Sequence, residues 1–353
     1  MYLIGRKLSL ESLAQYDVKR RVLCFIGRAL ACVPVAIALL WAFGALHYDF
    51  PVLHGALVWI FVLGILAVVV VVHGFWKKVG VILLAWILVL SCWLTLRPRD
   101  DRTWQPDVAE KAWAEINGDE VTLHNVRNCE YRTESDYTPH WETRNVRLTQ
   151  VTGADIAITY WGSPLIAHPI VSFAFADAPR LCFSIEARKE IRESYSSIGG
   201  FFRQYELIYV VADETDVLRL RTNYRQGEDV YLYRFTMTPA AARKHFLEYL
   251  DSLNALQRQP RWYNAVTTNC TTSIREQRPA GERLPWDWRL LVNGKSDELL
   301  FDRGLLATAG LPFTELKRRS LINERARAVT ATADFSNAIR AGGPSFEQRE
   351  TTR

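Results

Sequence analysis

The sequence predicts an α+β protein whose first part is a three-helix transmembrane anchor. Three observations predict this class: long apolar runs near the N-terminus, short alternating segments after residue 99, and an amphipathic helix after those segments. The chain has 353 residues, of which 49% are hydrophobic and 23% charged, and its net charge is +5. This composition is typical of a globular protein, and it excludes a disordered chain, a collagen and a polybasic nucleic-acid arm.

The apolar runs cover about residues 29–46, 52–72 and 79–96. Between residues 29 and 96 the only charged side chains are Asp49, Lys77 and Lys78. At about 1.5 Å per helical residue, each run can cross a hydrocarbon core of about 30 Å. We therefore expect residues 1–98 to form the anchor. The mean hydropathy of −0.05 averages these runs with a charged remainder.

Loop charges predict the orientation of the anchor. Six Lys and Arg residues precede the first run, the loop 47–51 has none, and the second loop carries Lys77 and Lys78. The positive-inside rule then places the N-terminus and the second loop in the cytoplasm. Because three is an odd number of crossings, everything after residue 96 is expected outside. No charged residue lies in the middle of a run, which argues against a transporter or a proton relay.

Residues 99–334 are expected to form one mixed α/β domain. Strands are predicted at 120–126, 155–161, 169–175, 181–187, 205–212, 217–222 and 230–237. Helices are predicted at 104–117, from Pro239, from about Cys270, and at 296–307. Strands followed by helices predict an antiparallel sheet packed on one side by helices. Residues 335–353, with Gly, Pro and Thr, are expected to be a disordered tail.

The cysteines do not form a metal-binding pattern. Three lie in or beside the apolar runs, and Cys129, Cys182 and Cys270 lie in the outer domain. There is no Cys-x-x-Cys and no Cys/His spacing of a zinc site, so we expect no metal and no cofactor. In an oxidising compartment, Cys129 and Cys182 could form a disulfide.

The segment around Cys270 carries the candidate chemistry. Thr and Asn residues at 267–269 are good N-cap residues, so Asn269 is expected to cap a helix whose first turn holds Cys270. Unpaired amides and the helix dipole there favour a thiolate and lower the pKa of the thiol. The alternative is an inert packed cysteine.

A nucleophilic cysteine needs a base and a group that orients the base. Of the histidines in the outer domain, His168 opens a predicted strand, and Glu186 lies on the next strand. If the two strands pair as a hairpin, both side chains share a face, and the carboxylate can orient the imidazole. The simpler interpretations are a strand-end histidine and a surface carboxylate.

Several motifs occur together in one order. They are YWGSPLIAH at 160–168, SIEAR at 184–188, GFFRQYEL at 200–207 and TNCTT at 268–272, with Ser172-Phe173 and Tyr263-Asn264 between them. In the identity and order of these motifs, about residues 125–310 of the chain resemble the bacterial Lnb N-terminal periplasmic domain family, a domain of unknown function. The resemblance implies an envelope location, so we expect a multi-pass protein of the bacterial inner membrane with a periplasmic domain.

A more distant similarity concerns the permuted NlpC-type, papain-like cysteine hydrolases and the lecithin:retinol acyltransferase-like proteins. It implies a papain-like fold with Cys270 as nucleophile, His168 as base, Glu186 as orienting residue, and Asn269 supporting the cap or an oxyanion hole. The residues after Cys270 are Thr271 and Thr272 rather than the Glu-His pair of the acyltransferase group, and the second upstream histidine of that group is missing, so the reaction type stays open.

The expected function is therefore a membrane-anchored thiol hydrolase or acyltransferase. Its substrates would be amide, ester or thioester bonds of peptidoglycan peptide, lipoprotein or lipid, and its partners the bilayer and an envelope substrate or protein, with no nucleic acid. The alternative is a catalytically silent envelope module for binding or scaffolding.

Overall fold

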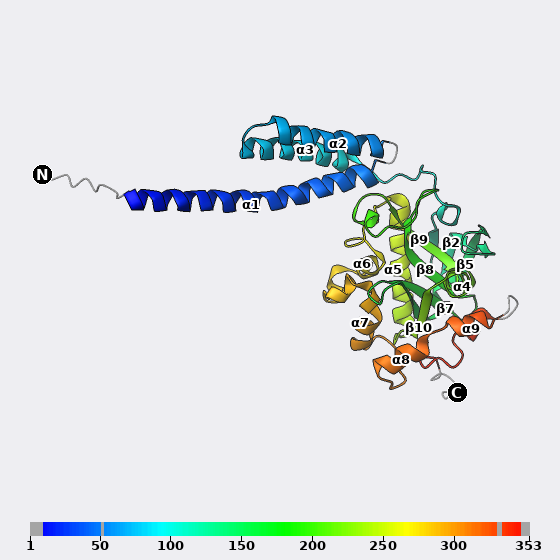
Figure 1. The fold of residues 1–353 in the computed structure, drawn as a ribbon. Helices are drawn as coiled ribbons and strands as arrows, with labels where there is room; N and C mark the ends of the chain where they lie inside the picture. Colours follow the sequence, from blue (N-terminus) through cyan, green and yellow to red (C-terminus); the bar gives the residue numbers. More distant parts are fainter. Residues whose placement is uncertain (1–9, 51–52, 330–333, 347–353) are drawn as a thin grey trace. The chain divides into compact units, whose positions relative to one another are not determined.

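A computed structural model describes residues 10–50, 53–329 and 334–346 (Figure 1). Its contacts divide the chain into two compact units. The helical unit comprises Met1–Arg97 together with Phe202–Gln204. The mixed unit comprises Pro98–Phe201 and Tyr205–Arg353.

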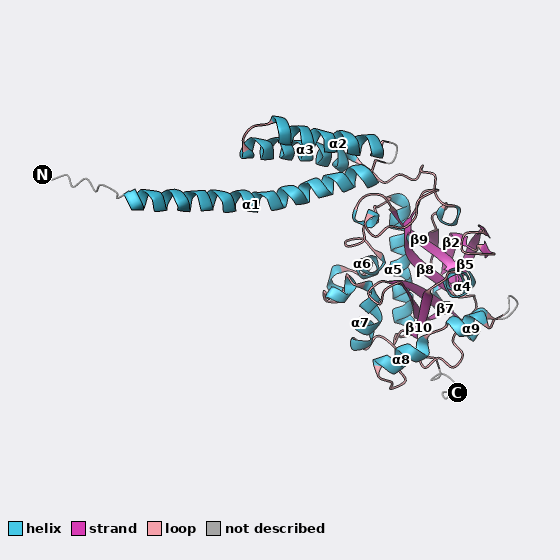
Figure 2. Cartoon of the chain, viewed as in Figure 1, coloured by secondary structure: helices cyan, strands magenta, loops and turns pink. Residues whose placement is uncertain are grey.

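Three helices build the helical unit: α1 (Leu10–Tyr48), α2 (His54–Val71) and α3 (Phe75–Thr95) (Figure 2). By length and composition two of them can cross a membrane, over Val18–Tyr48 and Phe75–Thr95. The apolar stretch of α2, Gly55–Val71, is shorter. The expected three-span anchor is thus supported for two spans only. The run 52–72 is shortened because Val72 is extended and Gly74 turns the chain with a φ of 95°.

Aromatic side chains hold the helical unit together. Trp93 donates a hydrogen bond from its Nε1 to Asp49 Oδ2 at 2.6 Å, and its ring meets that of Trp41 edge-on at 5.3 Å. Phe202 stacks on Tyr48 at 5.3 Å between ring centroids. Gly44 leaves room for this ring, because a Cβ at that position would lie 2.1 Å from Phe202 Cζ.

An eight-stranded sheet forms the centre of the mixed unit. Its strands are β1 (Trp113–Asn117), β2 (Glu120–Arg127), β5 (Trp141–Arg147), β6 (Val151–Trp161), β7 (Ala167–Phe175), β8 (Leu181–Arg188), β9 (Glu206–Asp213) and β10 (Glu228–Arg234). Their order is β1-β2-β9-β8-β7-β6-β10, and β5 also pairs with β2. The pairs are antiparallel except for β2 with β9, which is parallel. A small separate ladder joins β3 (Glu130–Tyr131) to β4 (Tyr137–Thr138).

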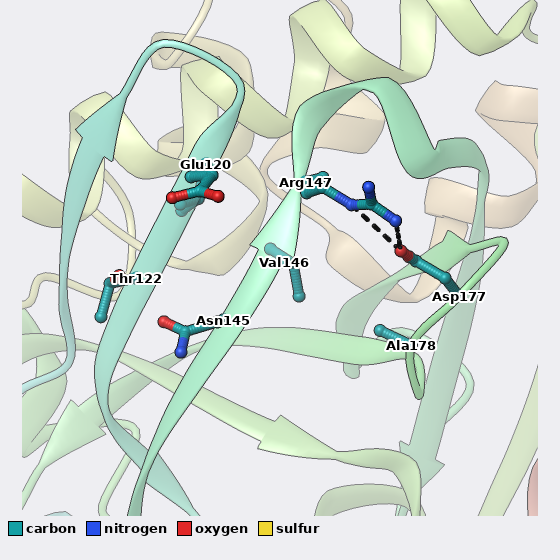
Figure 3. Close-up of a pocket in the computed structure, with 8 residues that line it drawn as sticks. Glu120, Thr122, Asn145, Val146, Arg147, Asp177 and Ala178 are labelled. Atoms are coloured by element: carbon teal, nitrogen blue, oxygen red, sulfur yellow. Dashed lines mark hydrogen bonds and ion pairs between the residues drawn. The ribbon is translucent and has the colours of Figure 1, made fainter.

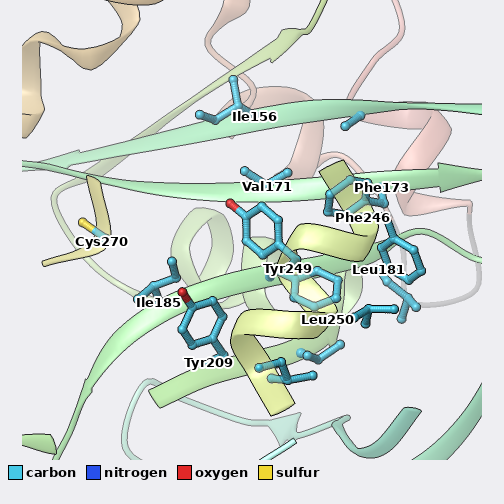
Figure 4. Packing of buried hydrophobic residues seen from close by; sticks show 14 of the residues in the cluster. Ile156, Val171, Phe173, Leu181, Ile185, Tyr209, Phe246, Tyr249, Leu250 and Cys270 are labelled. Atoms are coloured by element: carbon cyan, nitrogen blue, oxygen red, sulfur yellow. The ribbon is translucent and has the colours of Figure 1, made fainter. Parts of the chain in front are cut away.

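Helices cover both faces of this sheet rather than the one face that was predicted. On one face lie α5 (Pro239–Arg258), α6 (Cys270–Glu276), α7 (Ser296–Asp302) and α8 (Phe313–Ser320), and on the other α4 (Glu214–Arg219), α9 (Asn323–Arg327) and α10 (Phe335–Ala338). The aromatic side chains of α5 fill the larger core, where Phe246 and Tyr249 pack against Phe173 (Figure 4). The strand period of two sends alternate residues to the two cores. In β7, for example, Val171 joins the α5 core and Ile170 the α4 core.

Two predicted elements are wrong. Residues 104–117 are not a helix, because β1 forms a tight hairpin with β2 around Gly118, whose φ is 64°. Residues 217–222 are not a strand, because they continue α4 into a π-helical turn, Leu220–Tyr224. Helical spacing there buries Val217 and Leu218 while two acidic side chains of α4 form buried ion pairs.

The expectation of a disordered tail from residue 335 is also wrong for residues 335–346. Phe335 and Ile339 are buried in the α4 core. The guanidinium of Arg340 donates to Asp155 Oδ2 at 2.9 Å and to both carboxylate oxygens of Glu214 at 2.6 and 2.8 Å. A buried ion network therefore ties this segment to the sheet. The rest of the expected tail, 347–353, lies outside the described residues.

Candidate functional site

Helix α6 begins at Cys270 behind an asparagine cap. Asn269 has extended backbone angles, and its side chain accepts a hydrogen bond from the amide of Thr272 at 2.9 Å. The Thr272 hydroxyl in turn accepts from the amide of Asn269 at 2.9 Å. This reciprocal capping box satisfies two amides that a helix start leaves free. It holds Cys270 in the first helical turn.

The thiol of Cys270 is buried beside the aromatic core (Figure 4). Its side chain is 3% exposed, and Asn293 Nδ2 donates toward its Sγ at 3.8 Å. Burial raises the pKa of the Cys270 thiol, and the hydrogen bonds from Thr271 and Asn293 oppose that shift only in part. The expected lowering of this pKa is therefore wrong, because desolvation of the thiolate outweighs the helix start.

Asn293 was not found from the sequence. Its Oδ1 accepts the amide of Ala167 at the start of β7 at 3.0 Å while its Nδ2 faces the thiol. The turn that carries it is close-packed, because a Cβ at Gly294 would lie 2.4 Å from the carbonyl carbon of Leu165. The Asn-Gly pair at 293–294 is a turn signal in the sequence, but nothing in that signal points to Cys270.

His168 and Glu186 are brought together through a serine. His168 Nε2 lies 2.7 Å from Ser184 Oγ, and Ser184 donates to Glu186 Oε1 at 2.7 Å. Because the single hydroxyl proton points to the carboxylate, the network assigns the donating hydrogen of the ring to Nε2 and leaves the lone pair on Nδ1. Ser184 was also missed, although it lies two residues before Glu186 and so shares its face of the strand.

The charges around this chain of hydrogen bonds fix its protonation. Burial and the nearby Arg221 lower the pKa of His168 to about 3, although Glu186 acts in the other direction. Burial by itself would raise the pKa of Glu186, but the positive charge of Arg221, whose Nη2 lies 3.6 Å away, holds it well below its usual range. At neutral pH the imidazole is therefore neutral and the carboxylate ionised.

The structure does not bring Cys270 to His168. His168 pairs with Thr159 of β6 and shares the face of Ile170, which belongs to the α4 core. Cys270 belongs to the α5 core, on the opposite face of the sheet. No hydrogen bond joins the thiol to the imidazole in the described part of the chain. The expected nucleophile Cys270 and the pair of His168 with Glu186 are thus formed separately, on opposite faces of the sheet.

A largely apolar cavity of about 420 Å³ lies on the face of Cys270. Pro169, Val171, Ile274 and Leu299 are among the side chains that line it, and Thr271 borders it next to the thiol. His245 of α5 also lines it and is held by Glu248, whose Oε2 lies 3.0 Å from its Nδ1. This face therefore has a histidine–carboxylate pair of its own.

A second pocket is a weaker candidate. It lies over β2 and β5, has a volume of about 390 Å³, and is bordered by Glu120, Asn145, Arg147 and Asp177 (Figure 3). Arg147 and Asp177 form an ion pair there. No cysteine or histidine lines it. Within residues 10–50, 53–329 and 334–346, no group of three His, Cys, Asp or Glu side chains is placed to hold a metal ion.

Comparison with known proteins identifies one domain. Residues 137–294 match the family model of the Lnb N-terminal periplasmic domain. This segment holds both His168 with its partners and the start of α6, and the match confirms the resemblance drawn from the motifs. No curated protein and no solved structure matches the chain. With the apolar helices, the Lnb domain indicates a membrane-anchored protein with a periplasmic domain.

Proposed function

We propose that this protein is a thiol hydrolase or acyltransferase of the bacterial envelope with Cys270 as its nucleophile. The observation that carries the proposal is the position of Cys270, in the first turn of a capped helix beside the 420 Å³ cavity. Substrates would be amide, ester or thioester bonds of peptidoglycan peptide, lipoprotein or lipid. The apolar lining favours a substrate with a hydrophobic portion.

In this mechanism the thiolate attacks a carbonyl carbon and the leaving group takes a proton. Water or an amine then releases the acyl group from Cys270. His168, oriented by Glu186 through Ser184, is the proposed base, and the mechanism needs a papain-like, permuted NlpC-type arrangement in which the imidazole reaches the thiol. Because His168 lies on the face of the sheet opposite Cys270, this role requires a rearrangement of β7 that goes beyond the loose hydrogen bonds of apo sites. His245 with Glu248 is the competing base, because it already lines the cavity.

A second function is favoured by a specific observation. The thiol is buried, its pKa is raised, and His168 lies on the other face of the sheet. These features suit a catalytically silent envelope module that binds or scaffolds a protein partner. Nucleic acid is not a proposed partner, because many of the cations are paired with carboxylates, as Arg221 is with Glu228.

A thiol-directed activity probe on the full-length protein distinguishes the two functions. If Cys270 is the nucleophile, it reacts faster than the buried Cys129 and Cys182 of the same chain. His168→Ala slows that reaction if His168 is the base, and His245→Ala slows it if His245 is. The silent module predicts that Cys270 reacts no faster than the other two, that neither histidine variant matters, and that Cys270→Ser leaves the cellular phenotype intact.

The proposed location is the inner membrane, with three crossings, a cytoplasmic N-terminus and a periplasmic mixed unit. Helix α2 has 18 residues and so a length of about 27 Å, close to a hydrocarbon core of about 30 Å. Small mismatches of this kind are met by thinning of the bilayer. If the basic N-terminus is cytoplasmic, a periplasmic domain requires an odd number of crossings. When α1 and α3 both cross, α2 must therefore cross as well.

A further inference from the structure

A pocket lies between α1 and the start of α3 in the helical unit. It has a volume of about 490 Å³ and is lined by Lys19, Arg20, Leu23, Arg28 and Trp76, among others. Among the described residues that line it, three are cations and none is acidic. The described side chains that line the pocket therefore carry positive charge that none of them neutralises.

Its position along the helices is that of a bilayer boundary. Leu23 is 69% exposed and Trp76 63% exposed, and exposed apolar side chains such as Phe25 alternate with the cations of α1 as far as Arg28. Between Arg28 and His47 the exposed side chains of α1 are apolar. Exposed apolar side chains belong in the hydrocarbon region, whereas Lys, Arg and Trp collect at the headgroups. The pocket lies where the surface of α1 changes from one that contains cations to one that is apolar.

The start of α3 borders the pocket through Trp76. Gly74, which has no side chain, occupies the N-cap position, and the helix then begins at Phe75. The guanidinium of Arg28 lies 5.6 Å from the centre of the Phe75 ring, which brings this cation to the same helix start. First-turn amides and the helix dipole favour a negative group. The positive charge of Arg28 and the dipole of α3 both favour a negative group here.

We propose that this pocket binds the headgroup of an anionic phospholipid. The phosphodiester lies between Arg20 and Arg28, and an acyl chain runs along Leu23 and Trp76. A zwitterionic lipid would bring its ammonium group to the same three cations, so it binds more weakly. Basic pockets between transmembrane helices on the cytoplasmic side are suited to such headgroups. The site is independent of any chemistry at Cys270.

Native mass spectrometry of the full-length protein tests this site. The protein is released from nanodiscs of phosphatidylcholine and phosphatidylglycerol in equal proportion, and the retained lipid is identified. We expect phosphatidylglycerol to be retained in preference. In Arg20→Gln/Arg28→Gln its affinity falls by about fivefold for each cation removed, whereas Arg28→Lys keeps most of it.

The matched control is Lys77→Gln/Lys78→Gln, which removes the same amount of charge from the start of α3, at residues that do not line the pocket. It should retain phosphatidylglycerol nearly as the unaltered protein does. Equal losses in the two double variants would overturn the proposal in favour of general surface charge, and so would equal retention of both lipids by the unaltered protein. If thermal unfolding shows that a double variant does not fold, the single changes Arg28→Gln and Lys77→Gln make the same comparison.

Discussion

At the scale of single residues, burial decides the chemistry of both halves of the site. The Cys270 thiol is held protonated by its apolar surroundings, and His168 is held neutral by burial and by Arg221. Neither pKa shift can be predicted from the sequence, which indicates only that Cys270 is in the first turn of a capped helix. The cap itself could be predicted, because Asn269 and Thr272 are neighbours in the chain. The contact with Asn293 could not, because it depends on how a distant turn packs.

His168 makes the stability of the mixed unit depend on pH. The pKa of His168 is about 3 in the folded protein, against about 6.5 in the unfolded chain. Between these values the unfolded chain binds more protons, so this contribution to the free energy of unfolding is complete above about pH 6.5 and is lost as the pH falls toward 3. Glu206 acts in the opposite sense, because burial raises its pKa to about 7 and its contribution is lost as the pH rises through that value.

The comparison of His168→Gln with the unaltered protein isolates the histidine, because Glu206 is common to both. We expect the melting temperature of the unaltered protein to fall relative to that of His168→Gln as the pH is lowered from about 7 to about 5. Arg221, Arg225 and Glu186 face the ring in both proteins and keep their charges over this range. Parallel curves of melting temperature against pH would show that the imidazole is not held neutral.

At the scale of the elements, sequence patterns correctly predicted the helices and strands that depend on residues close together in the chain. The apolar spacing of Phe246, Leu250 and Leu253 predicted α5, and all three are buried. Alternation predicted β7 and β8 and placed His168 and Glu186 on one face. The helix predicted at 104–117 ignored the Asn117-Gly118 pair, a hairpin signal that was present in the sequence. The strand predicted at 217–222 had no such signal, because α4 is held by pairs with Arg127 and Arg340 from distant segments.

The turn 293–295 is an element whose packing can be tested directly. A Cβ at Gly294 would lie 2.4 Å from backbone atoms of Pro164 and Leu165, which cannot move as a flexible side chain does. We expect Gly294→Ala to lower the free energy of unfolding by about 1–3 kcal/mol. Chemical denaturation of the full-length protein measures it. Gly281→Ala is the control, because nothing lies within 4 Å of a Cβ there; equal effects of the two variants would contradict the close packing.

The segment 335–346 is held by a buried cation as well as by Phe335 and Ile339 in the α4 core. Arg340 pairs with Asp155 and Glu214, whose side chains are almost fully buried. Arg340→Ala takes this ion-pair partner from Glu214, whereas Asp155 keeps Arg180 and Arg234. We therefore expect a loss of about 3 kcal/mol in the free energy of unfolding, at the lower end for a broken buried pair. Arg318→Ala is the control, because its pair with Glu315 is exposed and surface pairs contribute about 0–1 kcal/mol. A loss from Arg340→Ala no larger than that from the control would show that the buried ion network does not hold this segment.

At the scale of the whole molecule, the number of crossings connects the helical unit to the function. Two helices pass the length and composition test for a span, and α2 is slightly shorter. The proposed envelope substrate is accessible only if the mixed unit, which contains the segment matched by the Lnb family model, lies in the periplasm. With a cytoplasmic N-terminus, two crossings would return the chain to the cytoplasm, whereas three would deliver the domain outside. The sequence overestimated the length of the second run because hydropathy does not show where the backbone leaves the helix, which is at Val72.

Reporter fusions after residues 50, 74 and 98 test the three crossings. Alkaline phosphatase is active only in the periplasm, so we expect activity after residues 50 and 98 and none after residue 74. Fluorescent-protein fusions at the same positions, which fluoresce only in the cytoplasm, should give the reverse pattern and control for expression. If α2 does not cross, the fusions after residues 50 and 74 report the same side, and the domain after residue 98 lies in the cytoplasm. A periplasmic thiol enzyme would then be impossible whatever the reactivity of Cys270, so this measurement bears on the function before any substrate is known.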